Sequence, residues 1–315
     1  MDKHRWKLYF IVIGLLAIYT FNMHASEGFA VMMVMLVAGV LFRVINYKPH
    51  QENVFEEEDE TEQALWQQHE TQTTIPHLPL VYRGIDLEIS TNDLIDILEK
   101  RQPYYNKLNP KLQERFIKRL QIFLAEKTFY IHDESGFKEM PVLISASAIQ
   151  LSFGLENFEL THYPHLHIYP EAFIHLHPHI RLLEGNVSGN RVNLSWKHFL
   201  HGFQYPEDGQ NVGLHEFAHA YYYQHFETEH EVEDAFDKHF PAFNNFTVYA
   251  MEFEKKPGNE LYTDYGLSHW QEFWAESVEI FFEKPHQLKS IHPKLYENMC
   301  NILQQRPAEN IFTVL

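Results

Sequence analysis

The stretch Val212-Gly213-Leu214-His215-Glu216-Phe217-Ala218-His219 places two histidines four residues apart, and it guides the interpretation of the whole chain. Residues at this spacing share one face of a helix, so both imidazoles can bind one metal ion while Glu216 lies near its open side. A structural zinc site usually has four protein ligands that include cysteine, and Cys300 is the only cysteine here. The pattern therefore indicates a catalytic zinc site, with an ordinary helix surface as the alternative.

The residues around this pattern favour a buried helix. Asp208 is a suitable N-cap, and no proline or glycine interrupts the chain from Leu214 to Phe226. An apolar face is formed by Val212, Leu214, Phe217, Ala218 and Tyr221. The sequence thus predicts a helix that turns Glu216 and His219 into a cleft.

A third ligand is expected from residues 264–282, which predict a strongly apolar helix. Its apolar positions include Phe273, Trp274, Val278, Phe281 and Phe282. Glu272, Glu276 and Glu279 follow one another at three- and four-residue steps along one face. A buried carboxylate without a partner is costly, so a metal ion would account for an acid on the inner side. The alternative is a solvated acidic face, which fits Glu276 or Glu279 better than Glu272.

Four blocks of sequence occur in a fixed order, namely Leu194-Ser195-Trp196, Asn211 to His219, Tyr265 and Glu272-Phe273-Trp274-Ala275. In this order they resemble the Mlc titration factor A group of zinc peptidases, and the resemblance covers roughly residues 100 to 300. It implies a zincin-like fold, Glu272 as the third zinc ligand and Tyr265 as the donor to the oxyanion. The family commonly continues its second histidine with Lys/Gln-Leu-Asp. This chain has Ala220-Tyr221-Tyr222 instead, so an acidic group near the metal-bearing helix is missing.

Together these residues predict hydrolysis of peptide bonds. One zinc ion per chain on His215, His219 and Glu272 leaves a position for water and lowers the pKa of that water toward about 7. Glu216 then takes the proton and passes it to the leaving amine, while Tyr265 donates to the negative oxygen, a contact typically worth about 3 kcal/mol. The expected substrates are peptides or unfolded protein ends.

A second function class comes from the same resemblance, which includes sequestering a sugar-responsive transcriptional repressor. Such a regulatory binding protein does not need an active site. The presence of all five catalytic and metal-binding residues at workable spacing favours a peptidase. Nucleic acid is excluded as a partner, because the net charge of −18 is opposite to what neutralising phosphates requires.

Near the N-terminus, two apolar stretches at residues 8–21 and 29–42 predict a transmembrane hairpin over residues 1–48. Each is 14 residues long and almost entirely apolar, and flanking aromatic and small residues extend both toward the roughly 20 that a span needs. Lysine and arginine lie outside the pair and are absent from the turn at 22–28, so both ends should face the cytoplasm. The alternatives are two helices of a soluble core and a cleaved signal peptide at the first stretch.

Residues 49–76 are polar and acidic, with the run Glu56-Glu57-Glu58-Asp59-Glu60 at their centre. Such a run buries too little apolar surface to fold, so we expect a flexible linker, with a docking site for a basic partner as the alternative. The linker would hold a metallopeptidase domain, residues 77–315, at the cytoplasmic face of the inner membrane. A single cysteine fits that reducing compartment.

The domain itself mixes helices with short strands. Asn109 and Pro110 predict the start of a helix whose inner face is Leu112, Phe116, Ile117, Leu120, Phe123 and Leu124. Strands are expected at 128–131, 166–169 and 191–195, and a helix within 140–155. This mixture predicts an α+β domain with a small sheet beside the zinc-bearing helices, preceded by the two transmembrane helices.

The segment from His162 to His179 is rich in histidine and raises the question of a second metal site. His165 and His167 would project on one side of an extended chain, and so would His175, His177 and His179. No cluster of acids or cysteines accompanies them, and three prolines interrupt the segment. The sequence therefore favours surface histidines without a ligand role.

Overall fold

The structure is a computed structural model that describes residues 79–133, 136, 138–175, 181–228 and 233–312. These residues belong to one compact unit, Thr73–Leu315. The predicted hairpin at 1–48 and the predicted linker at 49–76 lie outside the described residues. Within the described ranges, the helices are too short or too polar to cross a membrane.

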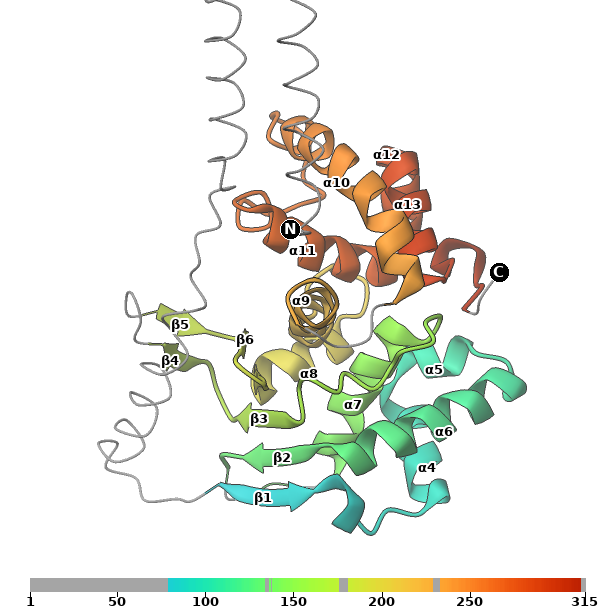
Figure 1. Ribbon diagram of the computed structural model, residues 1–315, viewed down its shortest axis with the longest axis vertical. Helices are drawn as coiled ribbons and strands as arrows, with labels where there is room; N and C mark the ends of the chain where they lie inside the picture. The colour runs from blue at the N-terminus through green and yellow to red at the C-terminus, as the bar shows by residue number, and fades with distance from the viewer. Residues whose placement is uncertain (1–78, 134–135, 137, 176–180, 229–232, 313–315) are drawn as a thin grey trace, which may run out of the picture. The chain divides into compact units, whose positions relative to one another are not determined.

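A five-stranded mixed sheet has the strand order β1-β2-β3-β7-β6 (Figure 1). Its strands are β1 (Leu80–Arg83), β2 (Thr128–Ile131), β3 (His165–Tyr169), β6 (Gly185–Ser188) and β7 (Arg191–Ser195). The three inner strands run parallel, and β1 and β6 pair antiparallel at the two edges. A separate antiparallel hairpin consists of β4 (Phe173–His175) and β5 (Arg181–Leu183).

The strands expected from sequence are present. The structure gives the bounds 128–131 and 191–195 as predicted, and β3 begins one residue before the expected 166. Alternation along these strands buries one face in the core, with Phe129, Ile131, Leu166, Ile168, Val192 and Leu194. The other face carries polar and aromatic residues such as Tyr130 and His167.

Helices supply most of the core. The first group is α4 (Thr91–Arg101), α5 (Pro103–Lys107), α6 (Pro110–Glu126), α7 (Glu139–Ser152) and α8 (Trp196–Gln204). The second group is α9 (Val212–Phe226), α10 (Asp234–Glu254), α11 (Trp270–Glu283), α12 (Pro285–Ile291) and α13 (Pro293–Leu303). Asn109 caps α6 as predicted, since its side chain accepts a hydrogen bond from Leu112 N at 3.1 Å. The predicted α+β class with a small sheet is confirmed.

Helix α9 lies between the sheet and α11 (Figure 1). It packs on β6 and β7 on one side and on α7, α8 and α11 on the others, so it is buried along most of its length. Its N-cap is Asn211, whose side chain accepts from Leu214 N at 3.1 Å. The prediction of Asp208 as the cap was wrong because a turn intervenes: Gly209 has a φ of +75°, and Asp208 accepts from Gln210 N.

Candidate metal centre

Helices α9 and α11 bring His215, His219 and Glu272 to one point. Glu272 Oε2 lies 3.1 Å from His215 Nε2 and 3.4 Å from His219 Nε2, and the two Nε2 atoms are 3.2 Å apart. The histidines share a helix face, whereas Glu272 comes from the first turn of a different helix, 53 positions later. Within the described ranges, these three residues form the one group of three or more potential ligands with converging atoms.

The spacing of the three atoms fits a zinc ion. Zinc–nitrogen and zinc–oxygen bonds are about 2.0 to 2.2 Å long, so neighbouring ligand atoms of a tetrahedral site lie about 3.3 Å apart. The distances of 3.1, 3.2 and 3.4 Å match that value. Two imidazoles and one carboxylate also leave one position of a tetrahedral ion for water, as catalytic zinc sites do.

Glu279 orients the first histidine. Its Oε1 lies 2.7 Å from His215 Nδ1, so Nδ1 donates to the carboxylate and the lone pair of Nε2 faces Glu272. Burial opposes a charge on His215, but the carboxylates of Glu279 and Glu272 outweigh burial and raise its pKa well above the ordinary value. The surroundings therefore favour a positive charge at Nε2, and a bound metal cation satisfies this preference.

His219 is held differently. Its ring stacks on Tyr223, with ring centroids 5.9 Å apart and an interplanar angle of 11°. The second ring nitrogen, Nδ1, is buried and has no hydrogen-bond partner among the described residues. The neighbouring Tyr221 donates to Phe158 O at 2.8 Å, and Tyr222 packs against Trp270. Where the resembled family commonly has Lys/Gln-Leu-Asp, this chain therefore contributes aromatic packing.

Glu216 is buried beside the edge strand β6. Burial raises the pKa of its carboxyl to about 8. A β-carbon placed on Gly185, at the start of β6, would lie 2.6 Å from Glu216 Cγ, so glycine is needed for this close approach. The sequence analysis did not select Gly185, because its importance depends on a contact between segments 31 positions apart.

Tyr265 lies in the loop between α10 and α11. Its side chain is 61% exposed, and its ring centroid is 6.4 Å from that of His215. The tyrosine is thus at the rim of the cluster formed by His215, His219 and Glu272, which is called the metal cluster below. This is the neighbourhood that the resemblance implies. Its role as an oxyanion donor stays a prediction.

The remaining glutamates of α11 are buried and paired, so the alternative of a solvated acidic face was wrong for Glu276 and Glu279. Glu276 accepts from the backbone N–H of Thr263 at 2.7 Å and from its hydroxyl at 3.0 Å. Glu279 also accepts from the backbone N–H of Asn211. Burial raises the pKa of the Glu276 carboxyl to about 7.

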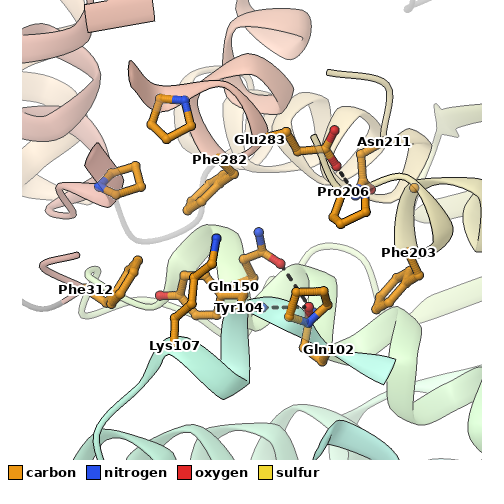
Figure 2. Close-up of a pocket in the computed structure, with 14 residues that line it drawn as sticks. Gln102, Tyr104, Lys107, Gln150, Phe203, Pro206, Asn211, Phe282, Glu283 and Phe312 are labelled. Carbon is orange, nitrogen blue, oxygen red and sulfur yellow. Dashed lines mark hydrogen bonds between the residues drawn. The ribbon is translucent and has the colours of Figure 1, made fainter. Parts of the chain in front are cut away.

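Glu283, one turn further along α11, fixes the start of α9. It accepts from Gly209 N and from Asn211 Nδ2, each at 2.9 Å. Figure 2 shows that Glu283 and Asn211 also line a pocket. The metal cluster does not line this pocket, which lies beyond the N-terminus of α9. Glu283 therefore contributes to the support of α9 rather than to the metal cluster.

The histidine-rich segment is only partly at the surface. His165 and His167 share one face of β3, as expected, but His167 is 9% exposed, so surface exposure was a wrong prediction for it. His167 Nδ1 lies 3.0 Å from Nε2 of His132, the residue that follows β2. Pairing of β2 with β3 buries this face, and a single strand does not show that. The positions of His177 and His179 lie outside the described residues.

Two comparisons with known proteins add to this geometry. The model of the family described as glucose-regulated metallo-peptidase M90 matches residues 86–304. The uncharacterized protein slr2042 of Synechocystis sp. is 26% identical over 227 residues, which cover 64% of this chain and 79% of that protein. The range matched by the family includes His215, Glu216, His219, Tyr265 and Glu272.

Proposed function

Because the chain belongs to the glucose-regulated metallo-peptidase family, which confirms the resemblance to the Mlc titration factor A group, we propose that it is a zinc-dependent peptidase. The observation that carries the proposal is the convergence of His215, His219 and Glu272 at distances that suit zinc. A family of metallopeptidases implies a metal ion. Zinc is the metal that the set of two imidazoles and one carboxylate favours.

Glu216 is the general base of the proposed reaction. A bound zinc ion would act as a Lewis acid and would lower the pKa of water at the site. The pKa of Glu216 falls from its raised value when a cation occupies the cluster, because an opposite charge favours the carboxylate. Glu216 then accepts a proton from water and returns it to the amine that leaves.

Tyr265 donates its hydroxyl hydrogen to the substrate oxygen that becomes negative. Its place at the rim, close to the ring of His215, supports this assignment. One donor of this kind contributes about 3 kcal/mol to the stability of a transition state. Tyr265→Phe should therefore keep the metal and lower kcat by about 100-fold.

An extended peptide is the substrate that the site accommodates best. In the sheet of described strands, β6 is at an edge and pairs with β7 on one side only. The close contact between Gly185 and Glu216 places this edge next to the general base. Backbone groups of an edge strand can bind a peptide by strand addition, which would align a scissile bond with the cluster.

The membrane placement is proposed from sequence alone. The apolar stretches at 8–21 and 29–42 and the flanking positive charges support a tether to the inner membrane, with the peptidase domain in the cytoplasm. Protease added to intact cells should then leave the domain uncut, and membrane fractions should retain the chain. Recovery of the full-length chain in the soluble fraction would contradict the tether.

Cleavage of a peptide library tests the proposed activity. The wild-type chain should cut a subset of peptides, and Glu216→Gln should lower the rate by about 10² to 10⁴ because the base is lost. Glu207→Gln, a change of the same type at a residue outside the cluster, is the matched control and should cleave at the wild-type rate. Equal cleavage by the wild type and Glu216→Gln would remove the proposal and leave the regulatory binding protein.

A further inference from the structure

The loop before α11 is attached to that helix through the buried carboxylate of Glu276 and through Tyr262, whose hydroxyl lies 2.8 Å from Ser277 Oγ. Glu276 lies one turn after Glu272 and is 6% exposed. Its Oε1 accepts from Thr263 N at 2.7 Å, and its Oε2 accepts from Thr263 Oγ1 at 3.0 Å. Burying a carboxylate is costly, and two hydrogen bonds from a single loop residue offset part of that cost.

The same contact organises the turn that contains Tyr265. Thr263 Oγ1 accepts from the backbone N–H of Gly266 at 3.1 Å, while Thr263 O accepts from Leu267 N at 3.0 Å. Tyr265 therefore lies inside a turn that Thr263 closes with both its side chain and its backbone. Since Glu276 binds Thr263 and Tyr262 anchors the preceding residue, Glu276 is the contact that reaches the turn itself.

Gly266 shows how closely this turn fits the helix. A β-carbon on Gly266 would lie 1.4 Å from Oε2 of Glu276, so a larger residue there requires the carboxylate to move. Moving the carboxylate would disturb its two hydrogen bonds from Thr263. The close approach of Gly266 to Glu276 is therefore a second observation, besides the hydrogen bonds of Thr263, that the turn lies against α11.

The backbone of Tyr265 is fixed by this turn. Its side chain is 61% exposed, so burial does little to fix the position of its hydroxyl. We propose that Glu276 is a positioning residue, which sets Tyr265 relative to the metal cluster by fixing the turn to the helix that carries Glu272. The inference rests on the proposed function, because it assigns Glu276 an effect on the oxyanion donor of that reaction.

A double-mutant cycle on the full-length chain tests this role. Glu276→Ala releases the turn, so kcat should fall by about 10-fold, below the loss of about 100-fold for removing the donor itself. KM should change little, and zinc should stay at one ion per chain because Glu276 does not reach the cluster. In the Tyr265→Phe background, Glu276→Ala should lower kcat by less than about 2-fold, since residues that act together are not additive.

A second pair of variants keeps the test valid if Glu276→Ala does not fold. Thr263→Val removes the hydroxyl that joins Glu276 to Gly266 and should lower kcat by about 3-fold, again only when Tyr265 is present. Thr247→Val is the control for the loss of a threonine hydroxyl, because that hydroxyl donates to Phe243 O within α10 and does not contact the turn; Thr247 is buried, whereas Thr263 is exposed. This control should leave kcat unchanged.

The outcomes separate this inference from the proposed function. Equal fold-losses for Glu276→Ala and Thr263→Val with and without the Tyr265 hydroxyl would overturn the positioning role and indicate general stabilisation. If Glu216→Gln also cleaved peptides at the wild-type rate, the proposed function itself would fail. Loss of zinc in Glu276→Ala would overturn the inference too, because the carboxylate would then support the metal.

Discussion

Two regions contain histidines, a residue type that can bind metals: the cluster on α9 and α11, and the face of β2 and β3 with His132 and His167, called the strand face below. They differ in the groups that contact the imidazole rings. At the cluster, His215 contacts two carboxylates, and its pKa is raised well above the ordinary value. On the strand face, His132 and His167 contact each other, and burial lowers their pKa values to about 4 and about 3. The carboxylates around His215 favour a cation, although burial lowers the pKa of His219 in the same cluster, whereas the strand face has no such carboxylates among the described partners and keeps two neutral imidazoles.

Stacking accounts for how the rings of the strand face pack. The ring of Tyr130 stacks on His167 with centroids 4.4 Å apart, and the ring of Tyr169 stacks on His132 at 4.2 Å. Parallel pairing of β2 with β3 places these rings in a row. Histidine content alone therefore does not identify a metal site; neighbouring carboxylates and converging lone pairs do.

The largest difference between the two regions should appear on removing one histidine from each. His219→Ala should lose zinc and all measurable peptide cleavage, because two ligands hold the ion poorly. His167→Ala, the matched variant on the strand face, should keep one zinc per chain and cleave normally. Metal analysis and a peptide assay measure both effects. Full zinc content in His219→Ala, or zinc loss in His167→Ala, would contradict the assignment of the zinc site to the cluster on α9 and α11.

A smaller effect is expected from the residue that orients His215. Glu279→Gln should weaken zinc affinity by about 10- to 100-fold, because the acceptor for His215 Nδ1 loses its charge. Competition with a chelator gives the affinity. Glu254→Gln is the control, since Glu254 is also buried and paired with a histidine, His292, but belongs to α10. Similar zinc affinities for Glu279→Gln and the wild type would show that Glu279 does not orient the ligand.

The smallest effect concerns pH and the strand face. The pKa values of His132 and His167 are lower in the folded chain than the ordinary value of 6.5, so the unfolded chain binds more protons between pH 6.5 and about 4. Stability should therefore decrease as pH falls through this window. Thermal unfolding of the metal-free chain should show a weaker pH dependence in His132→Gln than in the wild type. Identical dependences would indicate that His132 is not buried as a neutral ring.

Local patterns explain which parts of the molecule could be predicted from sequence. Helix α9 follows from a largely apolar stretch without proline or glycine from Leu214 to Phe226, β2 from a run of branched and aromatic residues, and β7 from the alternation of apolar and polar residues. The cap at Asn211 was missed because the turn at Gly209 delays the helix by three residues. A local pattern shows neither this turn nor its anchoring by Glu283.

The partners of the buried carboxylates could not be predicted for a different reason. Glu279 pairs with His215 from 64 positions away, and Glu276 pairs with a loop whose fold depends on Gly266. The spacing along α11 indicated one acidic face but not which carboxylate meets which partner. Likewise, the burial of His167 depends on the pairing of β2 with β3. Such contacts are set by tertiary packing, which a single periodic segment does not contain.

Metal analysis of the wild type, Glu272→Ala and Glu276→Ala tests the central claim most directly, namely that α9 and α11 form a zinc site with Glu272 as the third ligand. Both glutamates lie on the same face of α11, one turn apart, so the two variants remove the same side-chain atoms from neighbouring positions of one helix. The wild type and Glu276→Ala should contain one zinc per chain, whereas Glu272→Ala should contain much less. Absence of zinc from the wild type, or loss in Glu276→Ala with full occupancy in Glu272→Ala, would contradict the claim.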